Sequence, residues 1–200
     1  MKFMILGSER EVKDLFSEIC YKITTTICER NDDIVVCSPY GDSADSHVME
    51  SFCKIKSENK TKSKCYYFGP HNKDVDKEFD SLNFSNYIED KRFGFGEENQ
   101  DNMWLFSQIR ALNESDFLIA IGGNEGKTSE ITLGIAQLQN KKIITISTLG
   151  GSARKMFYKL EYDLNSPQYI NLGGELRERD LNAAINKIDT IQLPKEKKFL

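Results

Sequence analysis

The sequence predicts an α/β protein with a Rossmann-like open, mostly parallel sheet and helices on both faces. Short apolar, β-branched runs alternate with stretches of helical periodicity along the 200 residues, which is typical of parallel βαβ units. The clearest unit covers residues 116–147, where an apolar run, a glycine turn, a helical stretch and a β-branched run follow one another. Such a unit packs with parallel strands and a right-handed crossover.

The composition supports a folded chain with a solvated surface. Hydrophobic residues make up 39% of it, and 27 Lys and Arg nearly balance 31 Asp and Glu. A disordered chain combines low hydrophobicity with high net charge, so this chain is expected to bury a core. We expect a single domain over residues 1–193, followed by a charged tail over 194–200.

Each element is predicted from its own residue pattern. Apolar runs predict strands over residues 2–6, 33–37, 65–68, 116–121 and 142–147. Apolar residues three or four apart predict helices over 9–28, 44–52, 102–113, 129–138 and from 153 onward. A last strand over 169–172 and a terminal helix over 176–188 complete the prediction. Residues 71–96 have no clear periodicity, and their last four are expected to form a loop.

Charge and hydropathy exclude several classes of protein. No apolar run approaches the roughly 18–20 residues that cross a bilayer, and the N-terminal apolar stretch is too short for a signal peptide. We therefore expect a cytoplasmic chain without a membrane partner. The sequence pI is about 5.4, whereas nucleic-acid binders usually carry a basic face, so we also expect no nucleic-acid partner.

Cysteines and histidines are arranged unfavourably for a metal site. The five cysteines include no C-x-x-C pair, and the chain has only two histidines. We therefore expect no metal, no disulfide framework and no cofactor, and we interpret the cysteines as reduced, buried thiols. The same shortage of histidines disfavours a Cys-His pair and a Ser-His-Asp triad.

Glycines follow four of the predicted strands, at Gly7, Gly41, Gly122–Gly126 and Gly150–Gly151. Ligands of open parallel sheets bind outside the carboxyl ends of the strands, where glycine turns lead into helix N-termini that attract anions. Four such loops favour a phosphate-bearing, nucleotide-like ligand. A tight turn is the simpler interpretation of each of the other loops. The loop over residues 122–130 is instead interpreted as a ligand-binding loop.

That loop does not match either of two common phosphate-binding motifs. Gly126-Lys127-Thr128 looks like the end of a P-loop, but the first glycine is one residue too close, because Ile121 stands where it is required. The next strand also lacks the metal-holding Asp of an ATPase. The dinucleotide fingerprint fails because Gly122 and Gly123 are adjacent.

The loop instead resembles the G-G-x-x-G-T-x-x-E signature of the SLOG superfamily, Rossmann-like domains related to LOG phosphoribohydrolases and DprA. The match consists of Gly122, Gly123, Gly126 and Glu130, with Lys127 where the family has Thr and Thr128 one residue later. The turn over residues 148–153 is similar to the T-G-G-x-A turn of the Sir2- and TIR-associating (STALD) branch. The turn over residues 41–45 fits the second strand of the same fold.

The resemblance implies a sensor of Thoeris-type antiphage defence. It implies a small-molecule nucleotide ligand, namely a cyclic ADP-ribose-type or related ADP-ribose signal. It also implies a homo-oligomer, fused to or partnered with a Sir2, TIR or membrane effector module.

The candidate site residues follow from the strand ends and from this resemblance. Glu130 lies in the first turn of a helix, where it either accepts ribose hydroxyls or caps free N–H groups. Lys127 is either a phosphate contact or a solvated lysine. The predicted ligand-binding set is Gly7, Ser8, Gly41, Asp45, Arg92, Arg110, Gly122, Gly123, Asn124, Glu125, Gly126, Lys127, Thr128, Glu130, Thr148, Gly150, Gly151 and Ser152.

Two other functions compete with the sensor. The first is a LOG-like phosphoribohydrolase or a deoxyribosyltransferase-like enzyme that cleaves an N-glycosidic bond, for which Glu130 is the catalytic carboxylate. LOG enzymes pair it with an arginine whose position here falls near Ser107, so Arg110 and Arg92 are the shifted candidates. Either arginine holds a pyrophosphate or forms a surface ion pair. The second is a DprA-like nucleic-acid partner, against which the acidic pI argues.

Overall fold

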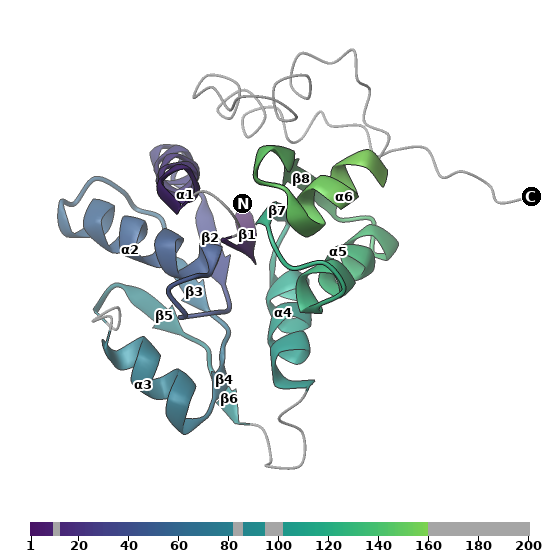
Figure 1. Ribbon diagram of the computed structural model, residues 1–200. Coiled ribbons are helices and arrows are strands. Elements are labelled where there is room, and N and C mark those ends of the chain that lie inside the picture. Colours follow the sequence, from purple (N-terminus) through teal and green to yellow (C-terminus); the bar gives the residue numbers. More distant parts are fainter. Residues whose placement is uncertain (10–12, 82–85, 95–101, 160–200) are drawn as a thin grey trace, which may run out of the picture.

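The computed structural model describes residues 1–9, 13–81, 86–94 and 102–159 (Figure 1). The predicted strand over 169–172, the helix over 176–188 and the tail over 194–200 lie outside the described residues.

Six parallel strands form the main sheet, in the order β5-β3-β2-β1-β7-β8. Their bounds are β1 (Lys2–Ser8), β2 (Asp33–Val36), β3 (Cys65–Tyr67), β5 (Ile88–Asp90), β7 (Phe117–Gly122) and β8 (Lys142–Ile146). The predicted Rossmann-like α/β fold is thereby confirmed.

Helices flank the central strands on two sides (Figure 1). They are α1 (Lys13–Glu29), α2 (Ala44–Ser57), α3 (Lys73–Ser81), α4 (Met103–Glu114), α5 (Thr128–Leu138) and α6 (Gly151–Lys159), with a short 3₁₀ helix η3 (Ser147–Leu149). Helix α1 packs against α2, and α4 packs against α5. Parallel strands covered in this way are apolar along their whole length, as all six buried residues of β7 illustrate.

Helix α2 extends five residues beyond the predicted end at residue 52, to Ser57. Its start is fixed by Ser43, whose hydroxyl accepts a hydrogen bond from the backbone N–H of Ser46 (3.1 Å). Lys54 and Lys56 lie in its last turn, where positive charge interacts favourably with the helix dipole. These two lysines therefore stabilise the end of the helix.

The described residues of the region that lacked periodicity form regular secondary structure. It contains α3, β5 and a separate two-stranded parallel sheet of β4 (Pro70–His71) and β6 (Phe93–Gly94). Residues 93–94, expected in a loop, thus form a short strand, and 95–96 lie outside the described residues. Stacking of Phe79 on buried Tyr67 (ring centroids 4.4 Å apart) fixes α3 to the main sheet.

The strand order reverses direction between β1 and β7. From β1 the chain proceeds through β2 and β3 to β5, then crosses back to β7 on the other side of β1. The carboxyl ends of β1 and β7 therefore form the topological switch point, where ligands of open α/β sheets bind.

The composition also bears on two other features, membrane-spanning helices and the state of the cysteines. In the described part of the chain, no helix has both the length and the apolar character that crossing a membrane requires. The five cysteines are free thiols, and all but Cys53 are buried.

Candidate ligand-binding rim at the switch point

Four loops lie at the carboxyl edge of the sheet, and we call them together the rim: residues 7–9, 38–43, 122–127 and 147–152. The loops after β7 and β8 interlock. Ser152 donates its backbone N–H to the Gly123 carbonyl (3.1 Å) and its hydroxyl to the Gly122 carbonyl (3.2 Å). Gly151 has φ +63°, and a Cβ there would lie 2.1 Å from the Gly123 oxygen, so only glycine permits this contact.

The ends of β1 and β7 are joined equally closely. The Gly123 N–H donates to the Ser8 carbonyl (3.1 Å). A Cβ on Gly7, which has φ +150°, would lie 1.8 Å from the Ile121 oxygen. The Ser8 hydroxyl oxygen is buried at this junction and has no hydrogen-bond partner among the described residues. The switch point thus presents a buried polar atom that requires a partner.

The loop after β2 completes the rim. Glu9 donates its N–H to the Asp42 carbonyl (2.7 Å), and Ser8 forms an antiparallel bridge with Ser43. Gly41 is exposed in this turn and has open space around it. Backbone contacts therefore connect the rim from the turn at residues 40–43 to the start of α6.

Asp45 lies beneath the rim. Its buried carboxylate accepts hydrogen bonds from the backbone N–H groups of Cys37 and Ser38, the latter at 3.2 Å. Burial raises the pKa of Asp45 to about 7, against the effect of these hydrogen bonds. The structure therefore gives this predicted ligand residue an internal role: it holds the loop after β2.

The outer half of the loop after β7 faces solvent. Asn124, Glu125, Gly126 and Lys127 are exposed, and Gly126 has φ +67° with open space around it. Lys127 is the N-cap residue of α5, and its side chain forms no capping hydrogen bond. Within the described chain, its ammonium group has no hydrogen-bond or ion-pair partner. Thr128 follows as the first, half-buried residue of the helix.

Glu130 is engaged by two groups. One carboxylate oxygen accepts the Gly126 N–H (2.8 Å), and the other pairs with the Lys155 ammonium (2.5 Å). The hydrogen bond from Lys155, followed by that from Gly126, lowers the pKa of Glu130. The N–H group that Glu130 accepts belongs to Gly126, which precedes the N-cap residue Lys127. Sequence reasoning missed Lys155, because its proximity to Glu130 arises only when α5 and α6 pack side by side.

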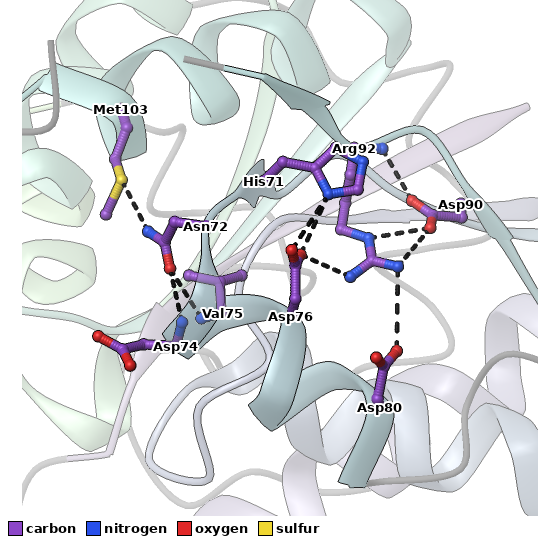
Figure 2. A network of polar contacts seen from close by, with 9 residues as sticks. All are labelled: His71, Asn72, Asp74, Val75, Asp76, Asp80, Asp90, Arg92 and Met103. Carbon is purple, nitrogen blue, oxygen red and sulfur yellow. Dashed lines mark hydrogen bonds and ion pairs between the residues drawn. The ribbon is translucent and has the colours of Figure 1, made fainter. Parts of the chain in front are cut away.

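Arg92 lies in a separate ionic cluster, which Figure 2 shows. Its guanidinium donates to Asp90 through Nε (2.9 Å) and Nη2 (2.7 Å), and to Asp76 through Nη1 (2.7 Å). Asp80 lies 4.0 Å away, and His71 contacts the same Asp76 (3.1 Å). The side chain is 11% exposed and packs over the Phe79 ring (4.6 Å). Its donors are therefore occupied by the protein itself.

Arg110 also lies apart from Glu130. On α4, its guanidinium packs over the rings of Phe93 (4.7 Å) and Phe68 (5.8 Å). The structure thus brings neither candidate arginine to the carboxylate, whose cation is Lys155 instead.

A third arginine, Arg154 on α6, contacts the loop after β8. It donates to the carbonyls of Ser147 (2.9 Å) and Thr148 (3.0 Å) beside Gly150. Arg154, which sequence reasoning also missed, fixes this turn from α6.

Metal-ligating side chains do not gather in the described part of the chain. No group of three or more His, Cys, Asp or Glu residues there is arranged to hold a metal ion. The described rim offers backbone N–H groups, hydroxyls, the exposed Lys127 and the carboxylates of Glu9, Asp42 and Glu125, next to Glu130, which is paired with Lys155.

Known structures share this fold at low sequence identity. DNA processing protein A (DprA) from Streptococcus pneumoniae has a TM-score of 0.60 and 12% identity over 79% of this chain and 56% of that one. DprA from Helicobacter pylori has a TM-score of 0.59 and 10% identity over 94% and 80% of the two chains, and its structure concerns single-stranded DNA binding. The molybdenum cofactor carrier protein from Chlamydomonas reinhardtii has a TM-score of 0.59 and 12% identity over 94% and 98%.

These neighbours share the fold of the chain, a Rossmann-like α/β domain. The chain spans just over half the length of the S. pneumoniae protein. No protein-family model matches the sequence, and no curated protein does.

The expectation that excluded a nucleic-acid partner is wrong. It depended on the acidic pI, yet the fold is shared with DprA, and the H. pylori structure concerns single-stranded DNA binding. Net charge averages over the whole chain, whereas binding depends on the potential at one surface. An acidic pI therefore does not exclude nucleic acid for this fold.

Proposed function

We propose that the rim binds a phosphate-bearing nucleotide, and that the chain is a nucleotide-sensing domain for a cyclic ADP-ribose-type signal. The observation that carries the proposal is the combination, at the switch point, of the buried Ser8 hydroxyl without a partner and the exposed Lys127 at the start of α5. The backbone is fixed at both residues: the Ser8 carbonyl accepts the Gly123 N–H, and the Lys127 carbonyl accepts the N–H groups of Glu130 and Ile131.

The phosphate end of the ligand belongs beside Lys127. The first N–H groups of α5 lack partners within the helix, and an anion near a helix N-terminus is stabilised by them and by the dipole. Lys127 adds a formal positive charge at the same place. Ser8 supplies a hydroxyl on the adjacent strand end, and this hydroxyl gains a partner when the ligand binds.

The ribose belongs beside Glu130. A carboxylate offers about four lone-pair positions, and the contacts with Gly126 and Lys155 use two of them. The remaining positions are available to ribose hydroxyls. Lys155 and the Gly126 N–H fix the orientation of the carboxylate before the ligand arrives, which reduces the entropic cost of binding.

The contacts of Glu130 favour binding over N-glycosidic cleavage. A general acid needs a raised pKa, but the hydrogen bond from Lys155 lowers the pKa of Glu130. The enzyme hypothesis also requires an arginine beside Glu130. Arg92 instead donates to Asp76, and Arg110 packs over the Phe93 ring.

Equilibrium dialysis tests the proposal. The protein is dialysed against cyclic ADP-ribose isomers, ADP-ribose, NAD and AMP, and both chambers are analysed by chromatography. We expect retention of an intact nucleotide, with an affinity at least about 10-fold weaker in Lys127→Ala, because a charge-assisted contact is lost. Lys62→Ala, which removes an exposed lysine in the loop that leads into the amino end of β3, is the matched control. Release of free base from AMP or NAD would support the enzyme instead.

Single-stranded DNA is a second candidate, favoured by the DprA neighbours. Fluorescence anisotropy of a labelled oligothymidylate, measured at two salt concentrations, distinguishes it from the mononucleotide. DNA binding falls steeply with salt because phosphate contacts release counterions. Tight, salt-sensitive oligonucleotide binding together with no mononucleotide retention would replace our first proposal by the second.

A further inference from the structure

An aromatic pair lies at the end of the rim farthest from α6. Tyr40, in the turn after β2, contacts Trp104 on the first turn of α4, with ring centroids 5.7 Å apart and planes inclined at 59°. Tyr40 is 37% exposed, and Trp104 is half-buried against the core. The tilt keeps the two rings from covering each other face to face, so aromatic surface remains open at this edge.

The helix geometry places this pair close to the phosphate loop. Helix α4 leads into the start of β7 and α5 leaves its end, so both helices begin at the carboxyl edge of the sheet. Gln108 of α4 accepts a hydrogen bond from Thr132 of α5 (2.6 Å). Trp104 and Thr128 each precede these residues by four positions, and therefore each stands about 6 Å nearer the rim along its own helix.

The rim contacts connect the pair to the switch point on the other side. The Ser43 N–H donates to the Tyr40 carbonyl (2.8 Å), and Ser43 bridges to Ser8. Ser8 in turn accepts the Gly123 N–H. Tyr40 and the glycine loop are thus two ends of one hydrogen-bonded edge.

Charge differs between these two ends. At the phosphate end, the exposed Lys127 lies two residues from the exposed Glu125, and Lys155 is paired with Glu130. At the aromatic end, burial and then the negative charges of Asp74 and Glu78 raise the pKa of Tyr40. Asn72, just before α3, contacts the Met103 sulfur at 3.2 Å, which brings acidic α3 next to the start of α4 (Figure 2). This end repels phosphate but accepts a neutral ring.

We infer that Tyr40 and Trp104 form the base-binding part of the rim, on which the nucleobase of the bound nucleotide stacks. The inference rests on the proposed function, since it assigns the base end of the same ligand. Every base offers a π-face, so the pair selects ligands that carry a base over sugar phosphates that lack one.

Trp104 is the single tryptophan of the chain, so intrinsic fluorescence reports on this place directly. The adenine nucleotides of the dialysis series are titrated into the protein, with ribose 5-phosphate as the match that lacks a base. We expect each retained nucleotide to quench the Trp104 emission, whereas ribose 5-phosphate leaves it unchanged.

Affinity provides the second readout. Trp104→Leu is expected to weaken nucleotide retention roughly 10-fold, while retention of ribose 5-phosphate is unaffected. Phe106→Leu, at an exposed aromatic residue of the same helix, is the matched control and should change neither. Trp104→Phe keeps a ring for stacking and is expected to restore most of the affinity, and the quenching measurement needs no variant at all.

The outcomes separate the two claims. Nucleotide retention with unchanged Trp104 emission and a normal Trp104→Leu affinity would overturn the base-binding role and leave the proposed function standing. Retention of no nucleotide would overturn both. Quenching together with the selective loss in Trp104→Leu would support both.

Discussion

Arg92 and Lys127 represent two regions in each of which the sequence offers a cation as a candidate phosphate contact. In the cluster of α3, β5 and β6, the Arg92 guanidinium is enclosed by Asp76, Asp80 and Asp90. At the rim, Lys127 is exposed and has no side-chain partner in the described chain. The first cation stabilises the fold and the second remains available for a ligand, so what decides between the two roles is the set of neighbouring acceptors.

The largest expected effect concerns the backbone of the rim. Gly151→Ala places a Cβ against the Gly123 carbonyl at a residue with φ +63°. We expect the free energy of unfolding to fall by about 3 kcal/mol or more, measured by chemical denaturation. Gly134→Ala is the control, because a Cβ inside α5 meets nothing within 4 Å, and it should stabilise the protein slightly. Equal stabilities of the two variants would contradict the interlocked rim.

The next effect concerns the Arg92 cluster. Arg92→Gln leaves three aspartates facing one another without their cation, so we expect a loss of about 2 kcal/mol in denaturation experiments. Nucleotide retention should be unchanged. The free energy of unfolding of Arg92→Lys should lie between those of wild type and Arg92→Gln. A lysine cannot replace the bidentate contact of the guanidinium with Asp90. Weaker nucleotide binding at unchanged stability would reverse the comparison.

Asp45 supplies a pH dependence. Its pKa in the folded state is about 7 and its ordinary value is near 4, so the folded protein holds the proton more tightly than the unfolded chain. Between about pH 4 and 7 this contribution to stability therefore falls as pH rises. In Asp45→Asn, the amide oxygen accepts the same two N–H groups and the titration is removed.

We expect wild type to lose about 2–3 kcal/mol relative to Asp45→Asn between pH 5 and 8. Urea denaturation of both proteins at the two pH values measures it. Parallel pH profiles would show that the carboxylate titrates normally and is therefore hydrated.

The smallest effect on stability is expected for Lys127→Ala. An exposed side chain without partners contributes little, so the free energy of unfolding should change by less than about 0.5 kcal/mol. The thermal midpoint compared with wild type and Lys62→Ala checks this. A marked destabilisation would mean that Lys127 resembles Arg92, and the distinction between the two regions would fail.

How far the sequence predicts the molecule also differs between these regions. The βαβ unit over residues 116–147 could be predicted because its information is local: β7 is apolar throughout, and the glycine turn separates it from α5. The strands β4 and β6 contain two residues each, too few for any periodicity. They are held by contacts between distant residues, such as Arg92 with Asp76.

For the candidate site, the conformation of the backbone could be predicted better than the contacts of the side chains. Glycines do lie at the carboxyl ends of the parallel strands, where their conformation and close approach depend on the glycine itself. The partner of Glu130 could not be foreseen, since Lys155 is 25 positions away and reaches it only through the packing of α6. Asp45 did carry a local signal: it follows the N-cap Ser43 by two residues, where a carboxylate faces free backbone N–H groups.

The loop after β7 is divided into an inner and an outer half at the bond between residues 123 and 124. Inside that boundary Gly122 and Gly123 are buried under neighbouring backbone, while outside it Asn124, Glu125 and Lys127 point into water. Substitution of an outer side chain is therefore expected to leave the core unchanged. If the proposed function holds, single substitutions in the outer half of the loop can change ligand preference one residue at a time while the fold stays intact.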